Sequence, residues 1–63
     1  MKVKDKVKVI SGNNEIGQPT MIDKIGVIQS FGTKYKVKGV ETFEVYVEFP
    51  NFGLHVFNDY QLT

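Results

Sequence analysis

The sequence predicts an all-β fold, and both its composition and its pattern of alternating residues support this prediction. Among 63 residues there are nine valines, five isoleucines and four threonines, but no alanine, arginine or tryptophan. β-branched side chains lose rotamer freedom in a helix and fit well on a pleated sheet. Apolar and charged residues alternate in several short stretches, which is typical of strands with one buried face. A chain of this length forms one domain, so we expect residues 1–63 to be a single domain.

The first predicted strand covers residues 3–10, in which Val7 and Val9 alternate with lysines. The polar cluster at residues 11–14 ends it, because Ser, Gly and Asn supply turn chemistry. A long connection then runs to about Asp23. Connections this long in a small domain are more often functional than incidental.

The second predicted strand covers residues 24–31 and contains Gly26. A glycine inside a strand indicates a bulge, a sharp bend or a close approach of two backbones. We expect Gly32 and Thr33 to turn the chain. Residues 34–38 then alternate again, until Gly39 ends that stretch.

Residues 43–49 form the clearest predicted strand, and a turn at residues 50–53 follows it. Its buried face should hold Phe43, Val45, Val47 and Phe49, and its outer face Glu44, Tyr46 and Glu48. A short strand at 54–57, one turn of 3₁₀ helix at 58–60 and a last pairing segment at 61–63 complete the chain. We therefore predict a five-stranded SH3-like small barrel, with a long first loop and a 3₁₀ turn before the last strand.

Two resemblances to known families support a barrel. Residues 6–12 and 26–28 resemble a KOW motif of ribosomal and transcription-elongation proteins, although the loop between them is longer than in that motif. Nearly the whole chain resembles the YorP-type proteins, which are small SH3-like barrels of phages and prophages of Gram-positive bacteria. The residues that carry this second resemblance are Asn13, Asn14, Gly17, Pro19, Ile22, Lys24, Gly26, Ile28, Phe57, Leu62 and Thr63. It implies a fold and a phage setting, hence the cytoplasm of the bacterial host cell, but no activity.

Catalysis is not expected from these residues. The chain has no cysteine, which excludes disulfides, thiolate metal sites and thiol nucleophiles. Its one histidine, His55, has no partner acid within sequence range, and no metal-ligand spacing or phosphate-binding glycine loop occurs. No apolar run approaches the length of a membrane span. We therefore expect no enzyme activity, no cofactor, no metal and no membrane segment.

Charge is unevenly distributed along the chain. Residues 1–40 hold eight lysines and three acids, for +5, whereas residues 41–63 hold four acids and no lysine, for −4. A row of three lysines, Lys34, Lys36 and Lys38, is expected on one strand face. Such a row either meets phosphates as point charges or forms a solvated edge that resists aggregation. The net charge of +1 and the absence of arginine favour a protein partner over nucleic acid.

Aromatic residues are the stronger candidates for binding. Three of them, Tyr35, Tyr46 and Phe52, are expected at the surface, where aromatic side chains commonly anchor protein interfaces. We therefore expect a non-catalytic module that binds a protein, and the resemblance to YorP-type proteins implies that this partner is a bacterial host or defence protein. The alternative is a KOW-like module that contacts RNA or DNA through its lysines.

Overall fold

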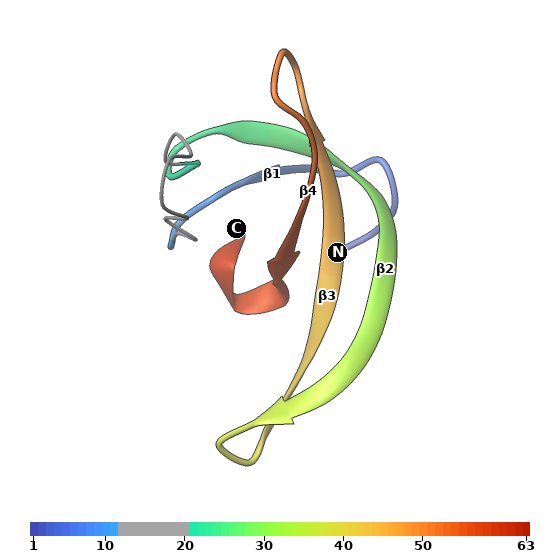
Figure 1. The fold of residues 1–63 in the computed structure, drawn as a ribbon, viewed down its shortest axis with the longest axis vertical. Coiled ribbons are helices and arrows are strands. Elements are labelled where there is room, and N and C mark those ends of the chain that lie inside the picture. Colours follow the sequence, from blue (N-terminus) through green and yellow to red (C-terminus); the bar gives the residue numbers. More distant parts are fainter. Residues whose placement is uncertain (12–20) are drawn as a thin grey trace.

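The computed structural model describes residues 1–11 and 21–63, and within them the fold is all-β, as the sequence predicts. The elements are β1 (Lys6–Lys8), β2 (Ile25–Val37), β3 (Val40–Phe49), β4 (Gly53–Asn58) and the 3₁₀ turn η1 (Asp59–Gln61). The strands form one antiparallel sheet in the order β1-β2-β3-β4. The sheet curls as a half-barrel around η1 (Figure 1). The predicted long loop falls mostly on residues 12–20 and so lies outside the described residues.

The predicted turn at Gly32 and Thr33 is wrong, because β2 continues through both residues. The pairing of β2 with β3 shifts register twice, between Ile28 and Ser30 and between Phe31 and Lys34. Such irregularities insert extra residues, bend the strand and increase its twist. The chain reverses later, at Lys38 and Gly39, which both have positive φ (51° and 81°). One long bent strand therefore replaces the predicted strand at 24–31, the predicted turn and the alternating stretch at 34–38.

The predicted fifth strand is a short closing contact instead of a strand. Leu62 forms an isolated antiparallel bridge with Val9. Beside it, the Lys8 amide donates to the Thr63 carbonyl and the Thr63 amide donates to the Lys8 carbonyl, both at 2.9 Å. The predicted 3₁₀ turn is present just before this contact, at Asp59–Gln61. The described chain thus has four strands and a carboxyl-terminal bridge, where the sequence predicted five strands.

The core lies on the inner face of the curled sheet. Its buried residues are Val7, Val9, Met21, Ile28, Val45, Val47, Phe49, Phe57 and Leu62. The predicted inward phase of Val45, Val47 and Phe49 is confirmed, while Phe43 is half-buried and packs against the cluster. Phe49 and Phe57 meet edge to face, with ring centroids 5.8 Å apart. This geometry is favourable for aromatic pairs in addition to the area that they bury.

Gly26 marks a close approach of β2 to β3. It pairs regularly with Val7, so the bulge considered for this position lies further along the strand. A Cβ atom at Gly26 would lie 2.6 Å from Val47 Cγ1 and 2.8 Å from the Glu48 carbonyl oxygen. Non-bonded carbon–carbon and carbon–oxygen pairs do not approach this closely. Only glycine therefore fits here without a backbone shift.

Replacing Gly26 by valine should therefore destabilise the fold by about 1–3 kcal/mol, since overpacking forces side chains and backbone to move. Thermal and urea unfolding of Gly26→Val against the wild type measure the effect. Lys36→Val, an exposed position on the same strand, is the matched control and should unfold within about 0.5 kcal/mol of the wild type. An unaltered melt for Gly26→Val would contradict the close approach.

Candidate functional site

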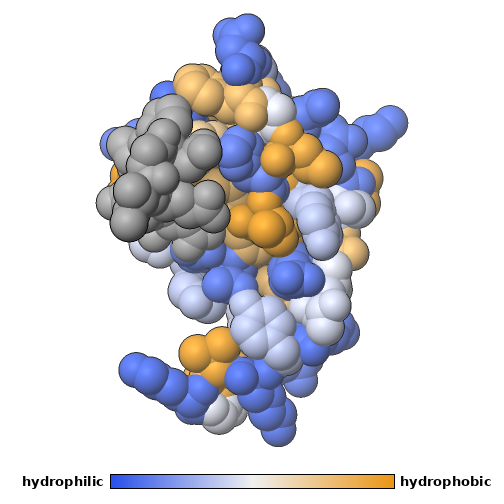
Figure 2. Space-filling model, in the orientation of Figure 1, coloured by the Kyte–Doolittle hydropathy of each residue, from blue (hydrophilic) through white to orange (hydrophobic). Residues whose placement is uncertain are grey.

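The end of the β2–β3 hairpin carries an apolar surface that lies beyond the core. Cross-strand partners share a face, and the register pairs Tyr35 with Thr42 and Val37 with Val40. Tyr35, Val37 and Val40 therefore lie on one face, with 36%, 37% and 68% of their surface exposed. We call these three residues the hairpin strip. The hairpin projects past η1 in Figure 1, and Figure 2 shows an apolar patch at this end of the molecule, flanked by hydrophilic residues.

The three predicted lysines do not share this face. The register pairs Lys34 with Phe43 and Lys36 with Glu41, so both lysines lie on the face opposite Tyr35. Lys38 lies in the turn that joins β2 to β3. The predicted lysines and Tyr35 therefore form two surfaces on the same hairpin and not one.

The 3₁₀ turn η1 is fixed against the hairpin by Asp59. Its carboxylate accepts a hydrogen bond from the hydroxyl of the buried Thr42 and a second, of 3.5 Å, from the Phe43 amide. Asn58 Nδ2 donates to the Tyr60 hydroxyl at 3.1 Å, while the Tyr60 side chain stays exposed. The turn thereby adds a second tyrosine at the base of the hairpin.

Partial desolvation and nearby ionisable groups shift the pKa of the Tyr35 phenol. The pKa of Tyr35 is raised from the usual 10.0, first by partial desolvation and then by electrostatic repulsion from Tyr60, Glu44 and Asp59. These groups therefore lie close to Tyr35 at the base of the hairpin. Because the phenol stays neutral at physiological pH, Tyr35 presents an apolar ring with a hydroxyl that donates and accepts hydrogen bonds.

The other two predicted aromatics lie elsewhere. Tyr46 is half-buried in the middle of the outer face of the sheet, between Ser30 and Val56 on the neighbouring strands. Phe52 is exposed in the β3–β4 turn, where the Lys24 ammonium lies 4.4 Å from its ring centroid. That distance is typical of a cation–π contact, so Phe52 already has a partner within the chain.

Of the predicted aromatic anchors, only Tyr35 belongs to the hairpin strip. Val37 and Val40 were not among the binding residues expected from the sequence. The signal was available: Val37 and Val40 flank the Lys38–Gly39 pair, and a turn at that pair brings them together at the tip.

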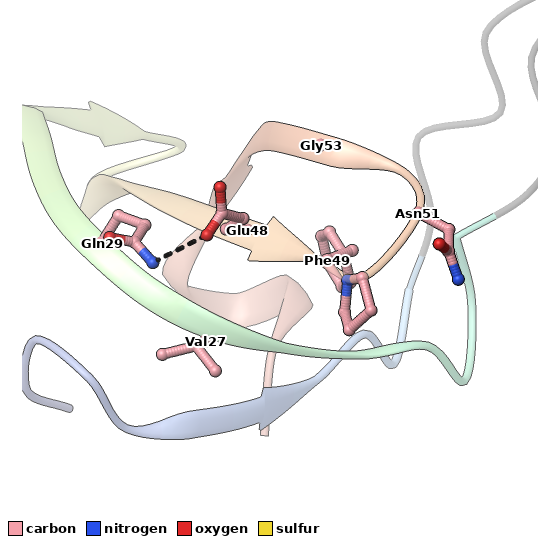
Figure 3. Close-up of a pocket in the computed structure, with 7 residues that line it drawn as sticks. Val27, Gln29, Glu48, Phe49, Asn51 and Gly53 are labelled. Carbon is pink, nitrogen blue, oxygen red and sulfur yellow. Dashed lines mark hydrogen bonds between the residues drawn. The ribbon is translucent and has the colours of Figure 1, made fainter.

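A concave region lies beside the β3–β4 turn (Figure 3). It is an open groove of about 510 Å³, lined by Val27, Gln29, Glu48, Phe49, Pro50, Asn51 and Gly53. Gln29 and Glu48 point toward each other from neighbouring strands, and Gln29 Nε2 donates to Glu48 Oε1 at 3.3 Å. The groove thus holds one carboxylate, already hydrogen-bonded, and no nucleophile beside a base.

His55 is held by its neighbours as a structural residue. Its Nε2 atom lies 2.9 Å from the Phe52 carbonyl oxygen, and its ring packs edge-on against Phe49 with centroids 5.9 Å apart. Within residues 1–11 and 21–63, no group of three or more His, Asp or Glu side chains gathers as a metal site would require. Over the same ranges, no helix is long and apolar enough to cross a bilayer.

Compared with protein-family models, curated proteins and solved structures, the chain matches none of them.

The surroundings of Tyr35 predict how its titration responds to one substitution. Glu44→Gln keeps an oxygen that accepts from the Thr33 amide but removes a negative charge, so the pKa of Tyr35 should fall toward 10.0. NMR titration of the Tyr35 ring Cζ measures it. Glu41→Gln, which removes an acid that does not act on Tyr35, is the control and should leave the midpoint unchanged. Equal midpoints in wild type and Glu44→Gln would contradict the placement of Tyr35 near Glu44.

Proposed function

We propose that the chain is a non-catalytic protein-binding module that contacts its partner through the hairpin strip and Tyr60. The observation that carries this proposal is the exposure of Tyr35, Val37 and Val40 on one face of a hairpin that extends beyond the core. These side chains add little to the core, although apolar groups are favoured inside a protein. Contiguous apolar surface rimmed by polar residues is typical of interaction sites.

The chemistry of the strip fits a protein partner better than a small molecule. It combines two valines with Tyr35, and Tyr60 lies beside it; tyrosine is among the residues enriched at binding hot spots. The hairpin strip lies on a strand face, whereas small-molecule sites are concave and bury most of their ligand. Lys34, Lys36 and Lys38 lie nearby on the other face and in the turn, where they are placed to steer an acidic partner.

We also propose that the fold is an SH3-like barrel. The bridge between Leu62 and Val9 gives the spatial order Leu62, β1, β2, β3, β4, with η1 between β4 and the bridge. This order and the 3₁₀ turn support such a barrel. The resemblance to YorP-type proteins adds a phage or prophage setting, with a host or defence protein of the bacterial cytoplasm as the partner. That setting rests on the resemblance alone.

A nucleic-acid-binding module is the second candidate, and one observation favours it. Lys34 and Lys36 share one face of the projecting hairpin, with Lys38 at its tip. Glu41 lies opposite Lys36, so this end of the hairpin carries three positive charges and one negative charge. The absence of arginine weakens this candidate, because arginine supplies most bidentate contacts to phosphates and bases.

Truncating the hairpin strip should weaken binding to the partner. A protein captured from host lysate, with and without nuclease treatment, is first purified, and its affinity is then measured by calorimetry. Tyr35→Ala should cost about 2 kcal/mol or more, equivalent to about a 30-fold weaker Kd. Phe52→Ala removes an exposed aromatic outside the strip and should change the Kd by less than threefold. If Phe52→Ala weakened binding and Tyr35→Ala did not, the binding surface would be the β3–β4 turn instead.

The two candidate functions differ in what they predict for oligonucleotides. Gel shifts with single- and double-stranded DNA and RNA at 150 mM salt should show only non-specific binding, with a Kd of about 10⁻⁴ to 10⁻⁶ M. Submicromolar binding to any of them, lost in the double variant Lys34→Glu with Lys36→Glu and retained in Tyr35→Ala, would replace the protein-binding proposal with the nucleic-acid one.

A further inference from the structure

The two edges of the sheet differ in how they are covered. At the β1 edge, the backbone of Lys8 exchanges two hydrogen bonds with Thr63, and Val9 pairs with Leu62. At the other edge, β4 pairs with β3 on one side, and no strand among the described residues pairs with its other side. An uncovered edge presents N–H and C=O groups that are able to pair with another strand.

β4 lacks the features that usually protect an edge strand. Its six residues, Gly53–Asn58, include no lysine, no acid and no proline. Its register with β3 runs through six consecutive pairs without a bulge. Exposed edges are usually blunted by charges, prolines or bulges, or kept very short. β4 is therefore able to accept a further strand.

The outer face of β4 is apolar next to this edge. Leu54 and Val56 are 57% and 42% exposed, whereas Phe57 on the inner face is buried. The outer-face neighbours of Leu54 and Val56 on β3 are Glu48 and Tyr46. A strand added to β4 would cover part of the two aliphatic side chains as well as the backbone.

We propose that the strand added at this edge is β4 of a second copy of the chain, paired antiparallel about a two-fold axis at His55. In this register Leu54 of each copy lies opposite Val56 of the other. The interface therefore contains two equivalent Leu54–Val56 pairs, and each pair shields both aliphatic side chains from water. The register keeps inner and outer faces matched, because residues two positions apart point the same way. The pairing is isologous: one surface serves both copies, and it closes as a dimer.

The charges of the four strands identify β4 as the strand that suits self-pairing. β1 carries Lys6 and Lys8, and β2 and β3 carry lysines or glutamates, so pairing any of them with its own copy would bring like charges together. β4 carries neither. In this register residues 53–57 of the two copies pair, which buries less than the roughly 1,200 Å² of standard interfaces, so the dimer should dissociate at micromolar concentrations.

The proposal is tested by sedimentation equilibrium between about 10 µM and 1 mM, concentrations that bracket a weak dimer. The mass should rise from 7.2 kDa toward twice that value and no further. Val56→Lys places a charge on the outer face of the edge strand and should weaken the dimer at least tenfold. Val40→Lys introduces the same change at the hairpin strip and should leave dimerisation unaffected. Circular dichroism establishes that both variants are folded, and Leu54→Lys substitutes for Val56→Lys if the latter unfolds.

The same variants separate this proposal from the proposed function. Val40→Lys should weaken binding to the protein partner and spare the dimer, and Val56→Lys should do the reverse. A wild-type chain that stays monomeric at 1 mM would overturn the dimer, as would growth to larger polymers. If the amides of β4 became protected from hydrogen exchange only when the partner binds, the edge would belong to the partner and the second copy would be excluded.

Discussion

The return of the carboxyl terminus to the first strand is the constraint on which the rest of this structure depends. Leu62 is buried in the core and bridges to Val9, while Lys8 and Thr63 exchange two backbone hydrogen bonds. The Ile10 amide donates to the Gln61 carbonyl at 2.8 Å and extends the contact by one more residue. A small domain buries a limited fraction of its surface, so sealing the open side of a curled sheet is important for its stability.

This closure also places both proposed binding surfaces. To reach β1, the chain leaves β4 through η1, where Asp59 binds Thr42 and Tyr60 is held near Tyr35. Because the chain crosses to β1 and does not turn back beside β4, it leaves β4 at the edge of the described sheet. The position of Tyr60 beside the hairpin strip and the open edge of β4 thus follow from one path of the chain.

The sequence predicted those features that alternation controls and missed those that depend on close packing between strands. The inward phase of Val45, Val47 and Phe49 followed from period-2 alternation alone, and it is confirmed. Gly32 was interpreted as a turn. A Cβ at this position would lie 2.7 Å from Glu44 Oε1 and 2.9 Å from Tyr46 Cε2, so Gly32 lies within a strand, close to side chains of β3. A single sequence does not distinguish these two roles of glycine, because both require only the absence of a side chain.

The candidate site was predicted in part, for a similar reason. Tyr35 was expected at the surface and is exposed there, on the face opposite Lys34 and Lys36, as alternation along a strand requires, but its neighbours Val37 and Val40 were not identified. Phe52 was expected at the surface and is exposed, but the contact of its ring with Lys24, which is 28 residues away in the sequence, was not foreseen. Contacts of this kind depend on how the strands curl, and they have no signature in local sequence.

Hydrogen exchange of the Lys8 and Thr63 amides tests the central claim, the carboxyl-terminal closure, most directly. If the closure holds the sheet together, both amides should exchange only through global unfolding, at the same free energy of opening as the amide of Val47 in the core. Exchange of both amides at the rate of an unstructured peptide, while Val47 remains protected, would show that the sheet is stable without the closure and would contradict this account.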